Sequence, residues 1–426
     1  MNTLRILVVL PLYGGSLPIG RYVASALQQE GHLVETFEAP DFYPAYDSLD
    51  ALKVTTDRLD YLQNSFLNVV SQAVLAKVES FEPDMVLSMA QAPLNRQALK
   101  RLRRDGVVTA MWFVEDHTLF TYWKSFAPLY DIFAVIQKGQ FFKDLESIGQ
   151  PNAVYLPLAA QPDFHQPVDL TPVEKRKFGS DVSFMGAGYA NRRKAFRDLV
   201  KYDFKLWGTE WDGDHVLAPL LQLKGARVTP EECVKIFNAT KINLNLHSSI
   251  QAEELVTFGD FVNPRTFELA ACGAFQLVDK RTLLDKAFAE DELATFSSMD
   301  DLIEKIDYYS TQPEKRKAIA ERGRARVLAD HTYTHRMRTL IEFTAERIPG
   351  WPKPKKQSSV FNTDYPPELA EDIKKLLGKL RLPEDVSFED LVWAVRQQEG
   401  KLSDLDTAIL FLDEWQKLYK KTGAIS

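Results

Sequence analysis

A short polar segment in the second half of the chain combines groups that can hold a nucleotide. It reads Asn263-Pro264-Arg265-Thr266-Phe267-Glu268 and follows a predicted strand and a polar loop. Because proline suits the first turn of a helix, we expect a helix to begin here and to present free N–H groups and partial positive charge to a diphosphate. Arg265 can add charge-assisted hydrogen bonds to phosphate, and Glu268 can accept from ribose hydroxyls. The predicted nucleotide-binding residues of this segment are Asn263, Arg265, Thr266, Phe267 and Glu268. The alternative is an ordinary crossover helix capped by Asn263.

Two glycine-containing turns could form further phosphate contacts. Gly186-Ala187-Gly188 lies between a predicted strand and a predicted helix whose first turn holds Asn191-Arg192-Arg193. Such a turn brings backbone N–H groups close to phosphates, and basic residues neutralise the charge. We favour Gly186 and Arg193 as ligands, with Arg192 as the alternative to Arg193. The turn Gly14-Gly15 follows the first predicted strand, and its backbone could approach the phosphates in the same way. A tight turn that needs positive φ explains these two glycines equally well.

A second group of polar side chains ends a strand in the first half of the chain. It is Glu115-Asp116-His117, directly after an apolar run. The carboxyl ends of parallel strands face the ligand crevice, so Asp116 and His117 are predicted to bind acceptor hydroxyls or to act as a base. A helix-capping role for Asp116 is the alternative.

Metal chemistry has little support in the sequence. Asp212-Gly213-Asp214 has the form of a metal-binding motif, but such a run in a loop is usually a turn. The only two cysteines, Cys233 and Cys272, do not have a metal-ligand spacing. We therefore expect no metal ion and no cofactor.

Short apolar runs alternate with amphipathic stretches through most of the chain, which predicts βαβ units and parallel sheets. The first series covers residues 1–165 and the second covers residues 180–347, where two helices are expected from Asp300 to Arg347. We interpret Gln161–Gly179, which contains three prolines, as the linker. Beyond the proline-rich stretch Ile348–Lys356, three or four helices form a C-terminal helical module at residues 360–426.

Five stretches of the second half together resemble the CgeB-like family of predicted GT-B glycosyltransferases. They are Asp260–Gly273, Val182–Gly186 with the following Asn191-Arg192-Arg193, Phe204–Gly208, Lys241–His247 and His331–Arg336. The resemblance covers residues 181–336 well, the N-terminal half loosely and Pro352–Ser426 not at all. It implies a GT-B fold, in which two Rossmann-like doubly wound domains face a cleft. The first domain would bind the acceptor and the second the nucleotide-sugar.

The same resemblance implies further site residues. Trp207 and Gly208 would belong to the donor site. Retaining GT-B enzymes carry two acidic residues with seven positions between them, a spacing that Asp260 and Glu268 match. By that comparison Asp260 would be a catalytic residue near the donor sugar, although an aspartate here replaces the motif's glutamate. GT-B enzymes generally stabilise the leaving diphosphate with helix dipoles and basic residues, so the resemblance implies metal-independent transfer with a lean towards retention.

Composition excludes several other classes of protein. The 426 residues carry a formal charge of −7, which argues against a nucleic-acid partner. With two cysteines a disulfide framework is excluded, and no apolar run approaches the length of an integral membrane segment. We expect a cytoplasmic protein.

The resulting hypothesis is transfer of a sugar, with a UDP-sugar favoured, to a hydroxyl of a protein or glycan acceptor. GDP and dTDP donors stay open. The alternatives are a nucleotide-sugar epimerase of the same fold and a non-catalytic interaction protein with a vestigial site. The C-terminal helices could dock an acceptor protein or mediate homodimerisation.

Overall fold

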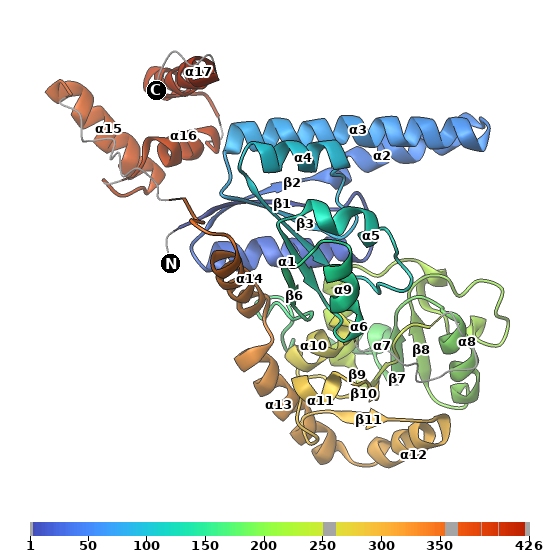
Figure 1. Cartoon of the computed structure of the whole chain (residues 1–426). Coiled ribbons are helices and arrows are strands. Elements are labelled where there is room, and N and C mark those ends of the chain that lie inside the picture. The colour runs from blue at the N-terminus through green and yellow to red at the C-terminus, as the bar shows by residue number, and fades with distance from the viewer. Residues whose placement is uncertain (1–2, 250–260, 354–364, 385, 399, 422–426) are drawn as a thin grey trace. The chain divides into compact units, whose positions relative to one another are not determined.

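The computed structural model describes residues 3–249, 261–353, 365–384, 386–398 and 400–421. The chain divides into two compact units, Met1–Trp351 and Pro352–Ser426. Unit 1 contains two parallel sheets flanked by helices, and unit 2 contains three helices within its described residues (Figure 1). The predicted architecture of two Rossmann-like domains followed by a helical module is confirmed.

The first domain is built on a six-stranded parallel sheet with the order β2-β1-β3-β4-β5-β6. Its strands are β1 (Arg5–Val9), β2 (Leu33–Phe37), β3 (Met85–Met89), β4 (Val108–Phe113), β5 (Ile132–Val135) and β6 (Ala153–Tyr155). Every residue of β1, β3, β4 and β5 is buried, as expected for parallel strands covered on both faces.

Helices cover both faces of this sheet. Helix α1 (Ser16–Gln29) packs Ile19, Val23 and Leu27 against Ile6 and Val8 of β1. Helices α3 (Thr56–Phe81) and α4 (Arg96–Arg104) lie along the opposite face (Figure 1). The shorter helices are α2 (Tyr43–Asp47), α5 (Trp123–Phe126) and α6 (Gln140–Ser147).

The second domain has a five-stranded parallel sheet with the order β11-β10-β9-β7-β8. Its strands are β7 (Ser180–Met185), β8 (Phe204–Trp207), β9 (Thr240–Asn245), β10 (Gln276–Asp279) and β11 (Ala294–Phe296). One face packs against α8 (Ala190–Phe196) and α12 (Met299–Ser310), and the other against α7 (Pro172–Phe178), α9 (Pro230–Ala239) and α10 (Pro264–Ala271).

In each sheet the strand order reverses next to the first strand. The reversal lies between β1 and β3 in the first domain and between β7 and β9 in the second. Doubly wound sheets bind ligands at such points, outside the carboxyl ends of the strands. The topology therefore indicates one ligand site in each domain.

The expected number of helices between Asp300 and Arg347 was wrong, and the predicted linker contains a short helix. The linker Gln161–Gly179 includes α7, which begins with a capping box between Thr171 and Glu174. Because the capping side chains satisfy the first N–H groups locally, a short helix forms despite the neighbouring prolines. The segment expected to hold two helices contains α12, α13 (Pro313–Asp330) and α14 (Tyr333–Arg347), and a further short helix α11 (Leu284–Ala287) precedes them.

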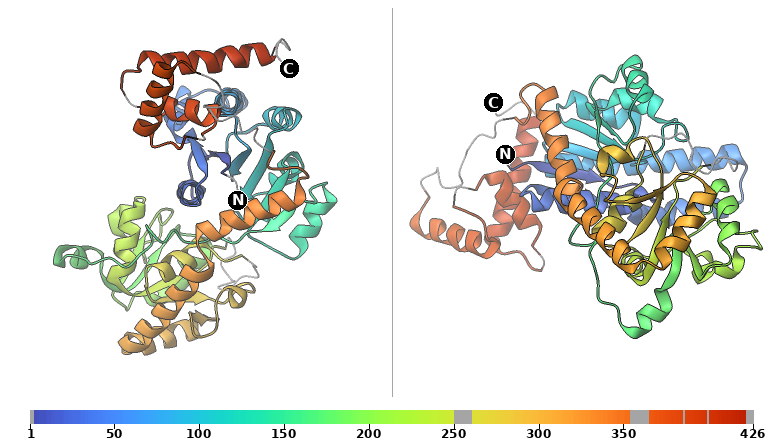
Figure 2. Two further views of the ribbon diagram at one scale, coloured as in Figure 1. Left: turned by 90° about the vertical axis from the view of Figure 1, so that its left-hand side faces the viewer. Right: turned by 90° about the horizontal axis from the view of Figure 1, so that it is seen from below.

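The chain passes between the two domains twice, and the two passages are paired. A parallel bridge joins Ala160 to Thr332, with Ala160 N–H bonded to His331 O and Tyr333 N–H bonded to Ala160 O, both at 3.0 Å. Helix α14 then runs along the first domain beside α1 (Figure 2). An ion pair of 2.9 Å between Arg338 and Glu30 joins these two helices.

His331 stabilises this paired passage in its neutral form. Its Nε2 donates to Ala287 O at 2.8 Å, and its Nδ1 accepts from Arg336 at 2.7 Å, because a guanidinium can only donate. Arg336 also donates to Pro157 O at 2.7 Å and to Leu158 O at 3.2 Å in the first domain. Burial and the adjacent Arg336 lower the pKa of His331 to about 4.

We therefore expect acid to destabilise unit 1 through His331. In the unfolded chain His331 takes up a proton at about pH 6.5, whereas in the folded chain it does so only at about pH 4. The free energy of unfolding is therefore highest above pH 6.5 and falls as the pH drops towards 4. His331 accounts for about 3 kcal/mol of this fall. Urea unfolding at neutral and acidic pH should show a shallower pH dependence for His331→Gln than for the native chain. Equal slopes would contradict the assignment.

The helices of unit 2 enclose a small core of their own. They are α15 (Pro367–Leu380), α16 (Phe388–Arg396) and α17 (Asp404–Lys421). Leu377, Leu391 and Val395 lie at its centre. Within the described parts of the chain, no helix has both the length and the apolar character needed to cross a membrane.

Candidate active site

Helix α10 begins where the sequence indicated. Asn263 is the N-cap, with its Oδ1 accepting from the N–H of Thr266 at 3.1 Å, and Pro264 lies in the first turn. The side chains of Thr266 and Phe267 are fully buried, so this structure gives them a packing role. The capped crossover helix is thus observed, and nucleotide binding by the segment stays a prediction.

A buried hydrogen-bond network fixes the start of α10 against the sheet. Asn263 Nδ2 donates to Asn245 Oδ1 at 2.8 Å, and Asn245 Nδ2 donates to Thr266 Oγ1 at 2.9 Å and to Gln276 Oε1 at 3.0 Å. Gln276 Nε2 closes the ring by donating to Thr266 O at 2.8 Å. Because moving the helix would leave several buried polar groups unpaired, its N-terminus is preorganised.

His247 joins this network through a single tautomer. The N–H of Asn263 donates to His247 Nε2 at 2.9 Å, so the ring proton resides on Nδ1 and is donated to Asp279 Oδ1 at 2.6 Å. Burial lowers the pKa of His247 despite the neighbouring Asp279. Burial would raise the pKa of Asp279, but the hydrogen bonds that it accepts from the ring and the backbone of His247, with the charge of Arg281 nearby, leave the pKa below its ordinary value.

The predicted ribose ligand, Glu268, lies where three segments meet. Its Oε2 accepts from Arg265 at 2.6 Å, and its Oε1 is 3.9 Å from His165 Nε2. His165 Nδ1 accepts from the N–H of Gln161 at 3.0 Å, so the ring proton on Nε2 faces the carboxylate. The ring of Tyr22, from α1 of the first domain, packs edge-on against His165 at 5.0 Å. Arg265 keeps 25% and Glu268 11% of its side chain exposed, so a ligand can reach the pair.

The basic cluster in α8 connects the loops at the strand ends. Arg192 donates to Leu246 O at 2.7 and 3.0 Å and to Ala187 O at 2.9 Å, which joins the loops after β7 and β9. Arg193 donates to Gly188 O at 2.7 Å, to Asp212 O at 3.0 Å and to Glu210 O. These carbonyls bind the guanidinium of Arg193, which was predicted to hold phosphate. To contact a phosphate, Arg193 would have to give up some of these hydrogen bonds, so its phosphate contact stays a prediction.

The glycines at the same strand ends allow two loops to touch. Gly208 has φ +115°, and a Cβ at this position would lie 2.6 Å from Gly186 O. The N–H of Gly186 donates to Trp207 O at 2.9 Å. The Trp207 side chain, predicted to contact the donor, is buried in a core cluster with Phe178.

We expect Gly208→Ala to destabilise the second domain by about 3 kcal/mol, because the new methyl group adds a backbone clash to the strain of positive φ. Gly213→Ala is the matched control. Gly213 also has positive φ, +79°, but a Cβ there meets no atom within 4 Å, so only the smaller conformational cost of about 1 kcal/mol applies. Chemical unfolding of both variants tests the difference, and equal losses would contradict the close approach.

The turn Gly14-Gly15 leaves space in front of α1. Gly14 has φ +107°, and a Cβ on either glycine would meet no atom within 4 Å. Gly15 caps α1 without a side-chain hydrogen bond. The positive φ explains Gly14 as a turn residue, while the open helix end agrees with the predicted approach of a donor.

Asp116 and His117 form a compact polar turn after β4. Asp116 Oδ1 accepts from Thr118 N–H at 2.9 Å and from its hydroxyl at 2.7 Å. His117 Nδ1 lies 2.9 Å from Gln137 Oε1, an acceptor, and the ring stacks on Phe141 at 4.1 Å. His117 Nε2 is thus the nitrogen left to accept a proton. Among the described residues, no hydrogen bond or ring contact joins this turn to the segment Asn263–Glu268. The acceptor role of Asp116 and His117 stays a prediction.

Two further predictions concern acidic residues. Asp260 lies outside the described residues. Asp214, from the suspected metal motif, pairs with Arg197 at 2.9 Å and accepts from the N–H groups of Val216 and Leu217. These contacts agree with the interpretation of that motif as a turn.

Sequence reasoning did not single out a half-buried carboxylate beside Asp116, that of Glu115. Glu115 accepts from Tyr122 Oη at 2.7 Å and from Gln91 Nε2. Burial raises the pKa of Glu115 even though these two hydrogen bonds oppose the shift. Its place at the carboxyl end of β4 was visible in the sequence, but its partners come from distant loops.

The comparisons with known proteins point to a glycosyltransferase with the GT-B fold. Residues 192–342 match the family described as glycosyl transferase-like. Solved structures that share the fold include a glycosyltransferase from Rickettsia africae ESF-5 (16% identity, TM-score 0.53, 82% of this chain and 99% of that one). Another is HepE from Anabaena in complex with UDP-glucose (10% identity, TM-score 0.54, 81% of this chain and 100% of that one).

The resemblance to CgeB-like proteins is also confirmed. The chain is 25% identical to the Spore protein CgeB of Bacillus subtilis (strain 168) over 256 residues, which cover 58% of this chain and 78% of that protein. The chain is therefore similar to a CgeB protein, as the five stretches of its second half indicated.

Proposed function

We propose that the protein transfers a sugar from a UDP-sugar to a hydroxyl group of a protein or glycan acceptor. The observation that carries this proposal is the preorganised N-terminus of α10, with the accessible Arg265–Glu268 pair one turn inside it. Helix dipole and guanidinium would hold the diphosphate, and Glu268 would accept from ribose hydroxyls. The complex of HepE with UDP-glucose supports the choice of nucleotide.

In the reaction, the bond between the anomeric carbon and the diphosphate oxygen breaks, and a bond to the acceptor oxygen forms. Negative charge grows on the leaving nucleoside diphosphate, where the α10 N-terminus and Arg265 stabilise it electrostatically. In a retaining reaction the acceptor proton would pass to the leaving phosphate. In an inverting reaction His117 or Asp116 would take it. We lean towards retention because Asp260 and Glu268 have the acidic-pair spacing.

Donor binding is tested by a thermal-shift screen of UDP-, GDP- and dTDP-sugars. A rise in melting temperature with one nucleotide class is the expected result, since a ligand that binds only the folded chain stabilises it. Incubating that donor without an acceptor then separates the classes: a new sugar isomer would favour an epimerase. Failure of every nucleotide to bind would favour a non-catalytic protein.

We also propose that transfer needs no metal ion, because the charges of α10 and Arg265 take the role of a cation. Sugar transfer in excess EDTA should equal that in buffer. A loss that Mn²⁺ or Mg²⁺ restores would contradict this proposal.

A further inference from the structure

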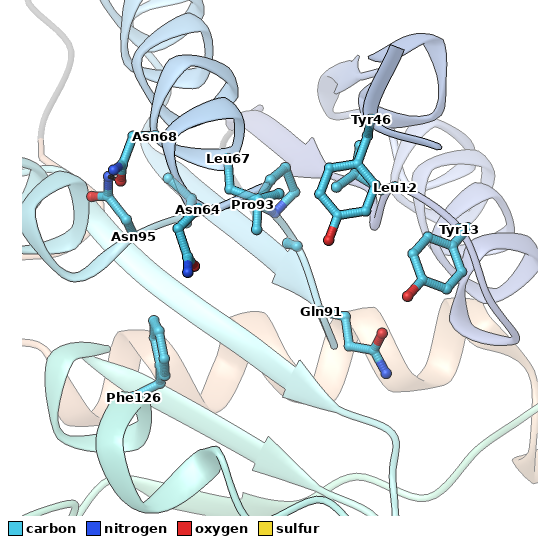
Figure 3. Close-up of a pocket in the computed structure, with 12 residues that line it drawn as sticks. Leu12, Tyr13, Tyr46, Asn64, Leu67, Asn68, Gln91, Pro93, Asn95 and Phe126 are labelled. Carbon is cyan, nitrogen blue, oxygen red and sulfur yellow. Dashed lines mark hydrogen bonds between the residues drawn. The ribbon is translucent and has the colours of Figure 1, made fainter. Parts of the chain in front are cut away.

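A cavity of about 390 Å³ opens in the first domain at the reversal point between β1 and β3 (Figure 3). It is formed by the loop after β1, the loop after β3, α2, α3 and α5. This size falls in the range of small-molecule sites, and the position is the one at which doubly wound sheets bind ligands. It lies outside the turn Asp116-His117, to which the sequence pointed.

The cavity carries polar groups without charge. None of its twelve lining residues is Asp, Glu, Lys, Arg or His. The side chains of Tyr13, Tyr46, Asn64 and Gln91 surround the central space (Figure 3). Among the described residues, the hydroxyls of both tyrosines and the amide of Asn64 have no protein hydrogen-bond partner, so they are available to a ligand.

Two hydrogen bonds hold Gln91 in position. Its Nε2 donates to Glu115 Oε1, and its N–H donates to Tyr122 Oη at 3.2 Å. The backbone of Gln91 is left-handed, with φ +64°, a strained conformation for a residue with a side chain. Since the carboxylate binds one hydrogen of the amide nitrogen, the amide oxygen and the second N–H of Gln91 are left for a ligand. Glu115 is thus a positioning residue.

Asn68 and Asn95 also line the cavity, where Asn95 Nδ2 donates to Asn68 Oδ1 at 2.8 Å. The rest of the lining is apolar and includes Leu67, Pro93 and Phe126. Sugar rings combine the same two properties: their hydroxyls donate and accept like side-chain amides, and their C–H faces pack on apolar and aromatic groups. A nucleotide or an acidic sugar would instead call for the cationic partners that this lining lacks. An extended peptide would favour a sheet edge, whereas the cavity lies at strand ends in the middle of the sheet.

We propose that this cavity binds an uncharged glycan segment, which is the acceptor for sugar transfer. This inference rests on the proposed function. Tyr13 directly precedes Gly14-Gly15, the turn predicted to approach the donor, so a glycan in the cavity would extend towards the reacting sugar.

Saturation-transfer NMR on the full chain tests the cavity with maltotriose, cellotriose and chitotriose at about 10 mM, a concentration that detects weak sites. Trigalacturonate and a lysine-rich peptide serve as charged comparisons. We expect at least one neutral trisaccharide to bind and its Kd to rise roughly fivefold or more in Asn64→Ala and in Tyr46→Ala, since each loses a hydrogen bond.

Two matched variants of α3, the helix that carries Asn64, provide the controls. Gln72 and Tyr61 are exposed residues of α3 outside the cavity, so Gln72→Ala and Tyr61→Ala should bind the sugar like the native chain. Absence of binding by all three neutral sugars, binding of only a charged ligand, or equal losses in all four variants would overturn the inference. UDP binding, measured on the same samples, should be unchanged. Failure of the native chain to bind UDP would count against the proposed function and would not count against the cavity as a glycan site.

Discussion

Replacing Glu268 with alanine is expected to weaken UDP binding by about 1–3 kcal/mol, roughly a fivefold to 150-fold rise in Kd. The carboxylate is the group placed to accept from the ribose, and it also orients Arg265 through a contact of 2.6 Å. Removing it takes away one ligand and loosens a second. Isothermal calorimetry with UDP measures the change, and Glu268→Gln should lie between the native chain and the alanine variant.

The chain offers a close control for this experiment. Glu292 accepts from Arg326 at 2.9 Å in the same domain and keeps 13% of its side chain exposed, compared with 11% for Glu268. Glu292→Ala therefore removes a similar ion pair away from the α10 N-terminus. Its Kd for UDP should equal that of the native chain. Equal Kd values in Glu268→Ala, Glu292→Ala and the native chain would remove Glu268 from the donor site.

Replacing His247 with phenylalanine is expected to destabilise the second domain by about 3–5 kcal/mol, the cost of leaving a buried charge without its partner. Asp279 is 0% exposed and relies on His247 for a hydrogen bond of 2.6 Å. The same change removes the acceptor for the N–H of Asn263, so the start of α10 loses its anchor. Urea unfolding measures the loss, and UDP binding should weaken in parallel.

Neutralising the aspartate isolates the electrostatic part of this loss. The double variant His247→Phe/Asp279→Asn should be less destabilised than the sum of the two single variants, because a neutral amide costs less to leave unpaired. His215→Phe, at an exposed histidine of the same domain, should change stability little. Strict additivity of the two buried substitutions would contradict the coupling of His247 and Asp279.

The sequence predicted the features that depend on neighbours along the chain. Alternating apolar runs indicated both parallel sheets, and Asn263 with Pro264 located the start of α10, because capping and proline effects act within one turn. The family resemblance added the GT-B arrangement of the domains.

Features that depend on contacts between distant loops were not predictable in this way. Arg193 was expected to meet phosphate, but in the structure it meets carbonyls of loops after β7 and β8. Nothing in the order of residues shows that these loops touch. His165 was placed in a linker, although folding brings it beside Glu268. The cavity at Tyr46 and Asn64 likewise arises only when α2 and α3 pack over strand ends.

The paired passage at Ala160 and Thr332 makes the second domain an insert in the first. Strands bonded in this manner lie about 4.8 Å apart, so the second domain has its entry and its exit at almost one point. The first domain is completed by α14, which belongs to the chain beyond that point. With the proposed donor site in the second domain and the proposed acceptor site in the first, we expect the two specificities to be separable. Exchanging residues 161–331 for the corresponding part of a relative should change the sugar that is transferred and leave the choice of acceptor intact.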